Sequence, residues 1–144
     1  GYAEGEPLPT LPQVLSGLPP ANSPPVFVDV LPGTIERYSG GGTTIAQLAL
    51  QEHYDRPYAE ILAERILEPL GMRDSTFAQP LPGAFVPRAA AGHHWGGATV
   101  AGRWHTYPEQ AAAGLWTTSC DYARFLVGLQ SAFLGRAGSL ITRE

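Results

Sequence analysis

The clearest hydrophobic pattern in the chain lies near its end, over residues 118–134. Large apolar side chains recur there at i, i+3, i+4, i+7 and i+11, the spacing that lines one face of an α-helix: Tyr122, Phe125, Leu126, Leu129 and Phe133. Thr118 and Asp121 stand three positions apart just before this stripe, as the two partners of a capping box do. The pattern therefore predicts an amphipathic helix that begins at Thr118.

A second helical pattern covers residues 43–54. Thr44 is the expected N-cap, and Gln47 three positions later completes a capping box. The apolar positions Ile45, Leu48 and Ala49 share one face of this helix.

A third helix is predicted over residues 56–70. Asp55 is the expected cap, and Pro57 occupies the first turn, where the missing N–H of proline costs nothing. Pro69 and Gly71 are expected to end the helix. Its apolar stripe consists of Tyr58, Ile61, Leu62, Ile66 and Leu70.

Residues 84–107 show the features of β structure instead. Two short runs, Ala89–Trp95 and Ala98–His105, are separated by the dipeptide Gly96-Gly97, which is a hairpin signal. The sequence thus predicts a short two-stranded hairpin. The aromatic side chains expected in the core are Trp95, Trp116, Tyr122 and Phe125.

Proline dominates the first 34 residues. A helical turn is predicted over Leu11–Leu15, and the rest is expected to be ordered loop in extended or polyproline-like conformation. Apolar anchors along this loop indicate that it lies against a larger body: Leu8, Leu11, Val14, Leu18, Val26, Phe27 and Val28. Such a surface predicts poor stability for the chain in isolation.

Composition and charge narrow the classes of function. The chain has 144 residues and a net charge of −4, and all nine of its basic residues are arginine. Because no basic patch is present, nucleic acid and anionic membrane surfaces are not expected as partners. No apolar run approaches the ~20 residues of a membrane span. The single cysteine, Cys120, can form no disulfide within the chain.

Three ordered stretches carry the candidate chemistry. They are residues 32–42 (PGTIERYSGGG), 68–76 (EPLGMRDST) and 112–125 (AAGLWTTSCDYARF). In this order and spacing they resemble segments of the serine β-lactamase-like family, which includes class C β-lactamases, D-alanyl-D-alanine carboxypeptidases and esterases.

The resemblance implies an α+β, mainly α fold class, the helical subdomain portion of the β-lactamase/transpeptidase-like fold with a short β-hairpin. As one partial domain, the chain divides into a packed proline-rich loop (1–34), a helical region with the tyrosine motif (35–83), a hairpin and cleft wall (84–117) and a C-terminal helix (118–144). In this family a Ser-x-x-Lys nucleophile pair precedes the tyrosine motif. Since the chain contains no lysine, we expect it to be an internal fragment that is inactive alone.

By this resemblance, Tyr38 is the catalytic residue. It would take the proton of the nucleophilic serine and return it to the leaving group, as general base and then acid. Ser39 and Gly40 would lie beside the substrate, although Ser39 also has the features of a turn or cap residue. Many family members have Asn at the position of Gly40, and its absence leaves room for an ester substrate.

The segment before the third stretch is the other candidate for substrate contact. Trp104, His105 and Tyr107 are expected to form a substrate-binding wall, and ordinary packing of the two aromatic residues is the open alternative. The spacing of His93, His94 and His105 is not that of zinc ligands, so no metal or cofactor is expected.

The predicted function is that of a part of a serine hydrolase that cleaves an amide or ester acyl substrate through an acyl-enzyme. The expected partners are a small-molecule or peptidoglycan-like acyl substrate and the remaining segments of the enzyme. A periplasmic or extracellular location is implied by the resemblance alone. The alternative is a non-catalytic module of the same ancestry that binds a ligand or a protein.

Overall fold

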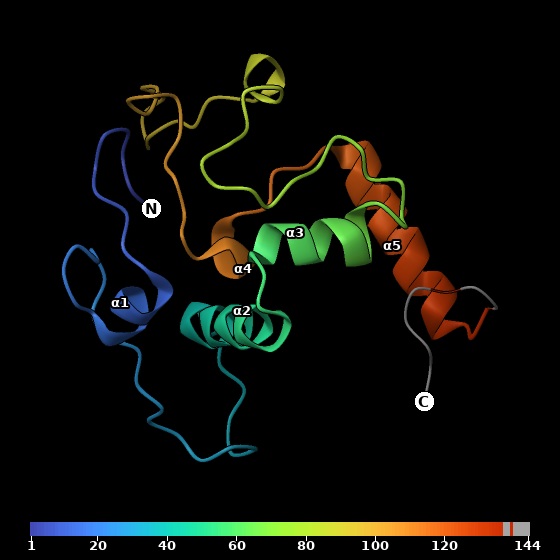
Figure 1. Ribbon diagram of the computed structural model, residues 1–144, viewed down its shortest axis with the longest axis horizontal. Coiled ribbons are helices and arrows are strands. Elements are labelled where there is room, and N and C mark those ends of the chain that lie inside the picture. Colours follow the sequence, from blue (N-terminus) through green and yellow to red (C-terminus); the bar gives the residue numbers. More distant parts are fainter. Residues whose placement is uncertain (137–138, 140–144) are drawn as a thin grey trace.

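The computed structural model describes residues 1–136 and residue 139. Its elements are α1 (Leu11–Ser16), α2 (Gly40–Tyr54), α3 (Tyr58–Leu62), the π-helical turn η1 (Ala63–Leu67), the 3-10 turn η2 (Val86–Arg88), α4 (Gln110–Ala113) and α5 (Ser119–Phe133). The described residues contain isolated β-bridges but no strand. The chain is thus mainly helical, and long irregular segments join its helices (Figure 1).

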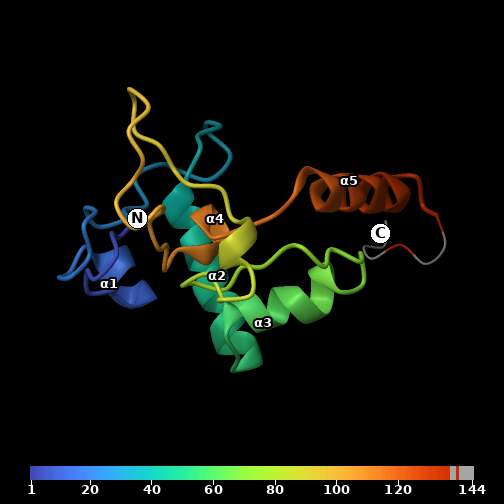
Figure 2. The same cartoon turned by 90° about the horizontal axis from the view of Figure 1, so that it is seen from above.

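Helix α2 is the centre of the packing. It contacts α1, α3 and α4, whereas α5 lies at the end of the molecule farthest from the N-terminus (Figures 1 and 2). The buried apolar side chains are few and come mainly from the segments around α1, α3 and η1: Tyr2, Leu11, Val14, Tyr58, Ile61, Leu67, Met72, Leu81 and Ala132. No helix among the described residues has the length and apolar character needed to cross a membrane.

The predicted helical turn near the N-terminus is present as α1. Thr10 caps it, with its side chain accepting the Gln13 N–H and the Gln13 side chain accepting the Thr10 N–H. Gly17 ends the helix in the left-handed conformation (φ 62°), which glycine adopts without strain. Leu11 and Val14 are buried, so they serve as anchors of the proline-rich loop.

Helix α2 begins earlier than the sequence predicts, and its cap is Ser39 rather than Thr44. The Ser39 Oγ accepts a hydrogen bond from the Gly42 N–H at 2.9 Å. Thr44 lies inside the helix, where its hydroxyl donates to the Gly40 carbonyl at 3.0 Å. A Cβ on Gly41 would lie 2.6 Å from Val26 Cγ1. Glycine is therefore needed for the proline-rich loop to approach the first turn of α2.

The helix predicted over residues 56–70 is confirmed over residues 58–67, but it is not one regular α-helix. The chain forms α3 and then widens into η1. Asp55 does not cap α3 but ends α2 in the left-handed conformation (φ 49°). Pro57 stands before the first residue of α3 and contributes no side-chain cap.

The predicted hairpin is present as a turn without strands. The His94 N–H donates to the Ala98 carbonyl at 2.8 Å, and a single antiparallel bridge joins His93 to Thr99. A regular ladder does not extend from it, because the chain turns again at Arg103 (φ 76°). Trp95 lies at the turn and is fully exposed, so its predicted place in the core is wrong.

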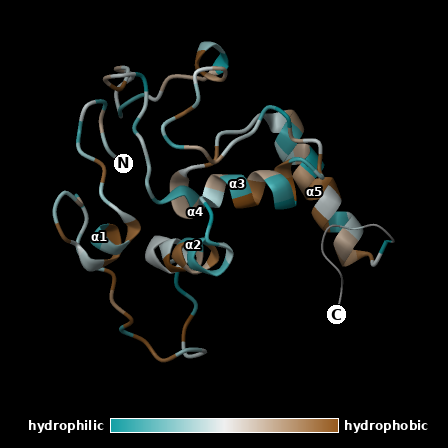
Figure 3. Ribbon diagram, in the orientation of Figure 1, coloured by the Kyte–Doolittle hydropathy of each residue, from teal (hydrophilic) through white to brown (hydrophobic). Residues whose placement is uncertain are grey.

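Helix α5 is confirmed, with Thr118 as its N-cap: the hydroxyl accepts the Asp121 N–H at 3.2 Å. The second half of the predicted capping box is not formed, because the Asp121 carboxylate turns away to other partners. The apolar stripe of α5 is largely open to solvent, since Tyr122, Leu126 and Leu129 expose 47%, 48% and 46% of their surface. Figure 3 shows apolar positions along the helix.

Candidate active site

Tyr38 stands at the entrance to α2, directly before the cap residue Ser39. Its side chain is 87% exposed, and within the described part of the chain it forms no hydrogen bond or ring contact. A Cβ on Gly40 would lie 3.6 Å from the Tyr38 hydroxyl, so the phenol lies over the first turn of the helix. The Ser39 hydroxyl is occupied by its cap hydrogen bond. Of this pair, only the tyrosine hydroxyl makes no hydrogen bond within the described residues.

Gln47, two turns along α2, fixes α4 to this helix. Gln47 is buried, with only 2% of its surface exposed. Its amide nitrogen donates to the Pro108 carbonyl at 3.0 Å, and its amide oxygen accepts the Ala111 N–H at 2.9 Å. The sequence indicates only a capping role for Gln47. The structure instead makes it the link that positions the segment leading from Tyr107 into α4.

We expect Gln47→Ala to lower the free energy of unfolding by about 2 kcal/mol, because two part-buried backbone groups lose their partner. Urea unfolding followed by circular dichroism measures this loss. Gln51→Ala is the matched control, since Gln51 lies one turn later and, among the described residues, its side chain bonds only to Gln47. Equal losses in the two variants would contradict the linking role.

The three residues of the predicted substrate wall pack against other parts of the chain. Trp104 makes an edge-to-face contact with Trp116 at 5.1 Å between ring centroids, and the Arg103 guanidinium lies 4.5 Å from the Trp104 ring centroid. His105 and Tyr107 surround Gly1, on which a Cβ would lie 2.8 Å and 2.6 Å from their atoms. None of these contacts involves Tyr38. The structure therefore supports packing of this segment and leaves its substrate role as a prediction.

A substitution separates packing from binding. We expect Trp104→Ala, in the complete enzyme, to raise KM about tenfold if the ring contacts substrate, a loss of roughly 1.4 kcal/mol of binding energy. His94→Ala is a suitable control, because that exposed residue lies on the neighbouring turn. An unchanged KM across acyl substrates would leave Trp104 with the packing role alone.

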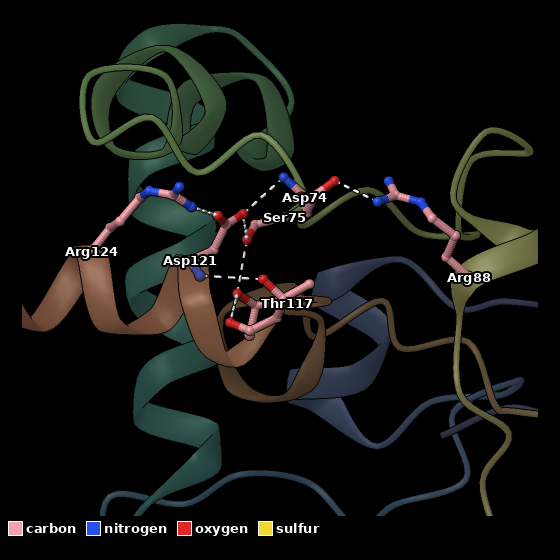
Figure 4. A network of polar contacts seen from close by, with 7 residues as sticks. Asp74, Ser75, Arg88, Thr117, Asp121 and Arg124 are labelled. Atoms are coloured by element: carbon pink, nitrogen blue, oxygen red, sulfur yellow. Dashed lines mark hydrogen bonds and ion pairs between the residues drawn. The ribbon is translucent and has the colours of Figure 1, made fainter.

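Asp121 joins the second and third motif stretches. Its carboxylate is fully buried, and its Oδ2 accepts hydrogen bonds from the Asp74 N–H and the Ser75 hydroxyl, both at 2.8 Å (Figure 4). Its Oδ1 accepts a hydrogen bond from Arg124 one turn later. Nearby, Thr76 and Trp116 exchange two backbone hydrogen bonds of 2.9 Å. These hydrogen bonds hold the two stretches together as one clamp. The clamp positions Trp116, whose ring contacts that of Trp104.

Hydrogen bonding determines the charge of this carboxyl. Burial raises the pKa of Asp121, but the donors on Ser75, Asp74 and Arg124 outweigh it, and the resulting pKa lies below the ordinary value of 3.8. Asp121 is therefore an anion at neutral pH that serves the structure. The sequence pattern places Asp121 in a cap and gives no signal for its partners across the chain.

No metal site is assembled in the part of the chain that the structure describes. Its residues include no group of three or more His, Cys, Asp or Glu side chains that could hold an ion. His93 and His94 lie on the exposed turn, and His105 is partly buried on the packed segment. Cys120, at the start of α5, is exposed and unpaired by any disulfide.

Comparison with known families identifies the class of protein. The beta-lactamase family model matches residues 3–143, so the chain belongs to that family. No curated protein sequence matches the chain. The family and the mainly helical fold class expected from the three motif stretches are confirmed, and the ancestry is that of a serine hydrolase.

Solved structures of one enzyme are similar to this chain. The D-amino acid amidase from Ochrobactrum anthropi SV3 complexed with L-phenylalanine has 27% sequence identity and a TM-score of 0.59, over 79% of this chain and 32% of that one. Its complex with L-phenylalanine amide gives 26% identity and a TM-score of 0.58 with the same coverage, 79% and 32%. Its complex with D-phenylalanine has 23% sequence identity and a TM-score of 0.56, over 77% of this chain and 35% of that one. The chain thus spans about a third of the length of the amidase.

Proposed function

We propose that this chain is the part of a serine hydrolase that carries the general-base tyrosine. The observation that carries the proposal is the position of Tyr38, exposed and unpartnered at the entrance to α2 in a chain of the beta-lactamase family. The nucleophile would come from a Ser-x-x-Lys pair in a segment outside these residues, since the chain contains no lysine.

The tyrosine would move one proton in each half of the reaction. Ammonium groups supplied by the remaining segments of the enzyme would favour the ionised phenolate. The phenolate of Tyr38 then takes the serine proton as the serine oxygen attacks the acyl carbonyl, and the phenol gives that proton to the leaving group as the acyl–leaving-group bond breaks. A water molecule attacks the acyl-enzyme in the second half, the phenolate accepts its proton, and the phenol returns that proton to the serine oxygen as the acyl–serine bond breaks. Free serine and the acid product result.

An amide or ester is the substrate class that this chemistry serves. The similar solved structures are those of an amidase, which supports an amide. Gly40 offers no side-chain amide to bind a substrate amide, which leaves an ester equally open. A small-molecule or peptidoglycan-like acyl compound is the proposed partner, together with the remaining segments of the enzyme.

A non-catalytic module of the same ancestry is the second candidate. These residues contain no lysine and supply no ammonium beside Tyr38, so they do not by themselves form the catalytic pair. Such a module would bind an acyl ligand or a partner protein through the same surface.

Turnover separates the two candidates. We expect the chain alone to hydrolyse neither p-nitrophenyl esters nor nitrocefin, and the complete gene product to hydrolyse at least one of them through an acyl-enzyme detectable by mass spectrometry. Turnover by the chain alone that is lost in Tyr38→Phe would overturn the need for an outside nucleophile. A complete gene product that forms no acyl-enzyme with any acyl probe would overturn the hydrolase proposal and favour the binding module.

A further inference from the structure

A hollow separate from the predicted catalytic residues lies between η2 and the start of α5. Its volume is about 340 Å³, within the range of ~300–1,000 Å³ that small-ligand pockets occupy. Its apolar lining consists of Leu81, Phe85, Ala89, Ala90, Leu115 and Trp116. None of the residues predicted to serve catalysis or substrate binding lines it.

Two opposite charges line this hollow and pair directly with each other. Arg88, at the end of η2, places its Nη1 2.5 Å from Oδ1 of Asp74, which belongs to the second motif stretch (Figure 4). Asp74 is held in place through its backbone N–H, which donates to the buried Asp121 carboxylate. The Arg88 guanidinium also lies 5.8 Å from the centroid of the Phe85 ring. The Asp74 backbone and the Arg88 guanidinium are thus both held in position next to the apolar lining of the hollow.

The direct ion pair is easily replaced by a ligand. The Arg88 and Asp74 side chains expose 59% and 45% of their surface, and exposed ion pairs are screened by solvent and contribute little to stability. A ligand that carries both a carboxylate and an ammonium can take over both partners. It also covers apolar surface that the ion pair leaves open to water.

We propose that this hollow binds a small zwitterion with an apolar side chain, of the α-amino acid type. The carboxylate would accept paired hydrogen bonds from the planar Arg88 guanidinium, and the ammonium would pair with Asp74. The side chain would lie against Leu81, Phe85 and Trp116. A ligand with one charge is disfavoured, because a lone carboxylate meets Asp74 and a lone ammonium meets Arg88.

Three isosteric probes test the proposal on the full chain by calorimetric titration. Leucine carries both charges, 4-methylpentanoate lacks the ammonium, and 3-methylbutylamine lacks the carboxylate. We expect leucine to bind at least about tenfold more tightly than either analogue, since each lost charged hydrogen bond weakens binding by that order. Absence of leucine binding, or equal binding of all three probes, would overturn the proposal.

Substitutions at the two charges give a signature that a merely structural ion pair would not. Arg88→Gln should weaken leucine binding about tenfold or more, and Arg88→Lys should weaken it less, because lysine keeps the charge without the planar fork. Asp74→Asn should weaken leucine binding but strengthen binding of 4-methylpentanoate, since the repulsion is removed. Arg73→Gln is the matched control, because Arg73 is exposed and lies outside the hollow.

Circular dichroism establishes that each variant is folded before titration. If Asp74→Asn unfolds the chain, binding of the three probes to Arg88→Gln and to Arg88→Lys still tests the proposal. Parallel changes for all three probes in these variants would contradict charge recognition. The proposal does not depend on the hydrolase chemistry of Tyr38, so each can fail without the other.

Discussion

In the proposed complete enzyme, we expect Tyr38→Phe to lower kcat by about 10²–10⁴-fold, the usual contribution of a positioned general base, while KM changes little. The substitution removes one hydroxyl and leaves the ring. Tyr38 is 87% exposed and forms no hydrogen bond within the described residues, so its hydroxyl contributes nothing visible to the fold. The loss should therefore fall on proton transfer, and steady-state kinetics with a p-nitrophenyl ester measures it.

Tyr54→Phe is the matched control for this prediction. Tyr54 ends the same helix, and its ring contacts His53 and Arg65. We expect its kcat to remain within about twofold of the parent, since its hydroxyl is outside the reaction. A Tyr38→Phe enzyme with the full kcat would remove Tyr38 from the proposed mechanism.

The largest effect on stability is expected at Asp121. Asp121→Asn should lower the free energy of unfolding by about 3 kcal/mol, because hydrogen bonds to a charged group contribute roughly 1.5–3 kcal/mol each. The substitution leaves an amide where Asp74, Ser75 and Arg124 all donate. Native domains are stable by only about 5–15 kcal/mol, so this single change removes a large share. Urea unfolding at pH 7 measures it.

Arg124→Gln is the control for Asp121→Asn. Its side chain is 53% exposed, and it leaves the Asp74 and Ser75 donors in place, so a loss below about 1 kcal/mol is expected. Equal losses in the two variants would show that the ion pair, rather than the clamp between the motif stretches, carries the energy.

The lowered pKa of Asp121 also fixes a pH dependence. The folded chain keeps this carboxyl charged at pH values where the unfolded chain has bound a proton. Its stabilisation is therefore complete above the unfolded pKa of about 3.9 and declines as the pH falls through the lower folded pKa. We expect the difference in stability between the parent and Asp121→Asn to shrink below pH 4. A difference that stays constant or grows there would contradict the assignment.

The sequence predicted correctly those helices whose caps and apolar spacing lie within a single segment of the chain. Helix α5 has a regular apolar spacing and a threonine cap, and both lie within one segment of the sequence. The start of α2 could not be predicted in the same way, because three consecutive glycines favour a loop. Helix forms there because Ser39 caps the first turn and because Val26 packs where a Cβ would stand on Gly41.

The parts of the site that the sequence did not predict depend on distant contacts. Asp121 bonds to residues 46 and 47 positions earlier, and Gln47 bonds to a carbonyl 61 positions later. Spacing within one helix carries no information on such partners. The exposed apolar stripe of α5 illustrates the same limit of sequence-based prediction. The helical period is predicted correctly, but it does not reveal which surface, if any, covers the stripe.

The coding sequence upstream of the Gly1 codon tests the serine-hydrolase proposal most directly. We predict a Ser-x-x-Lys pair within about 100 residues before Gly1, the order of size of half a domain or more. Its presence would supply the nucleophile and the ammonium that Tyr38 needs. An upstream coding sequence without such a pair would contradict the catalytic role of Tyr38 and leave the chain as part of a non-catalytic member of the family.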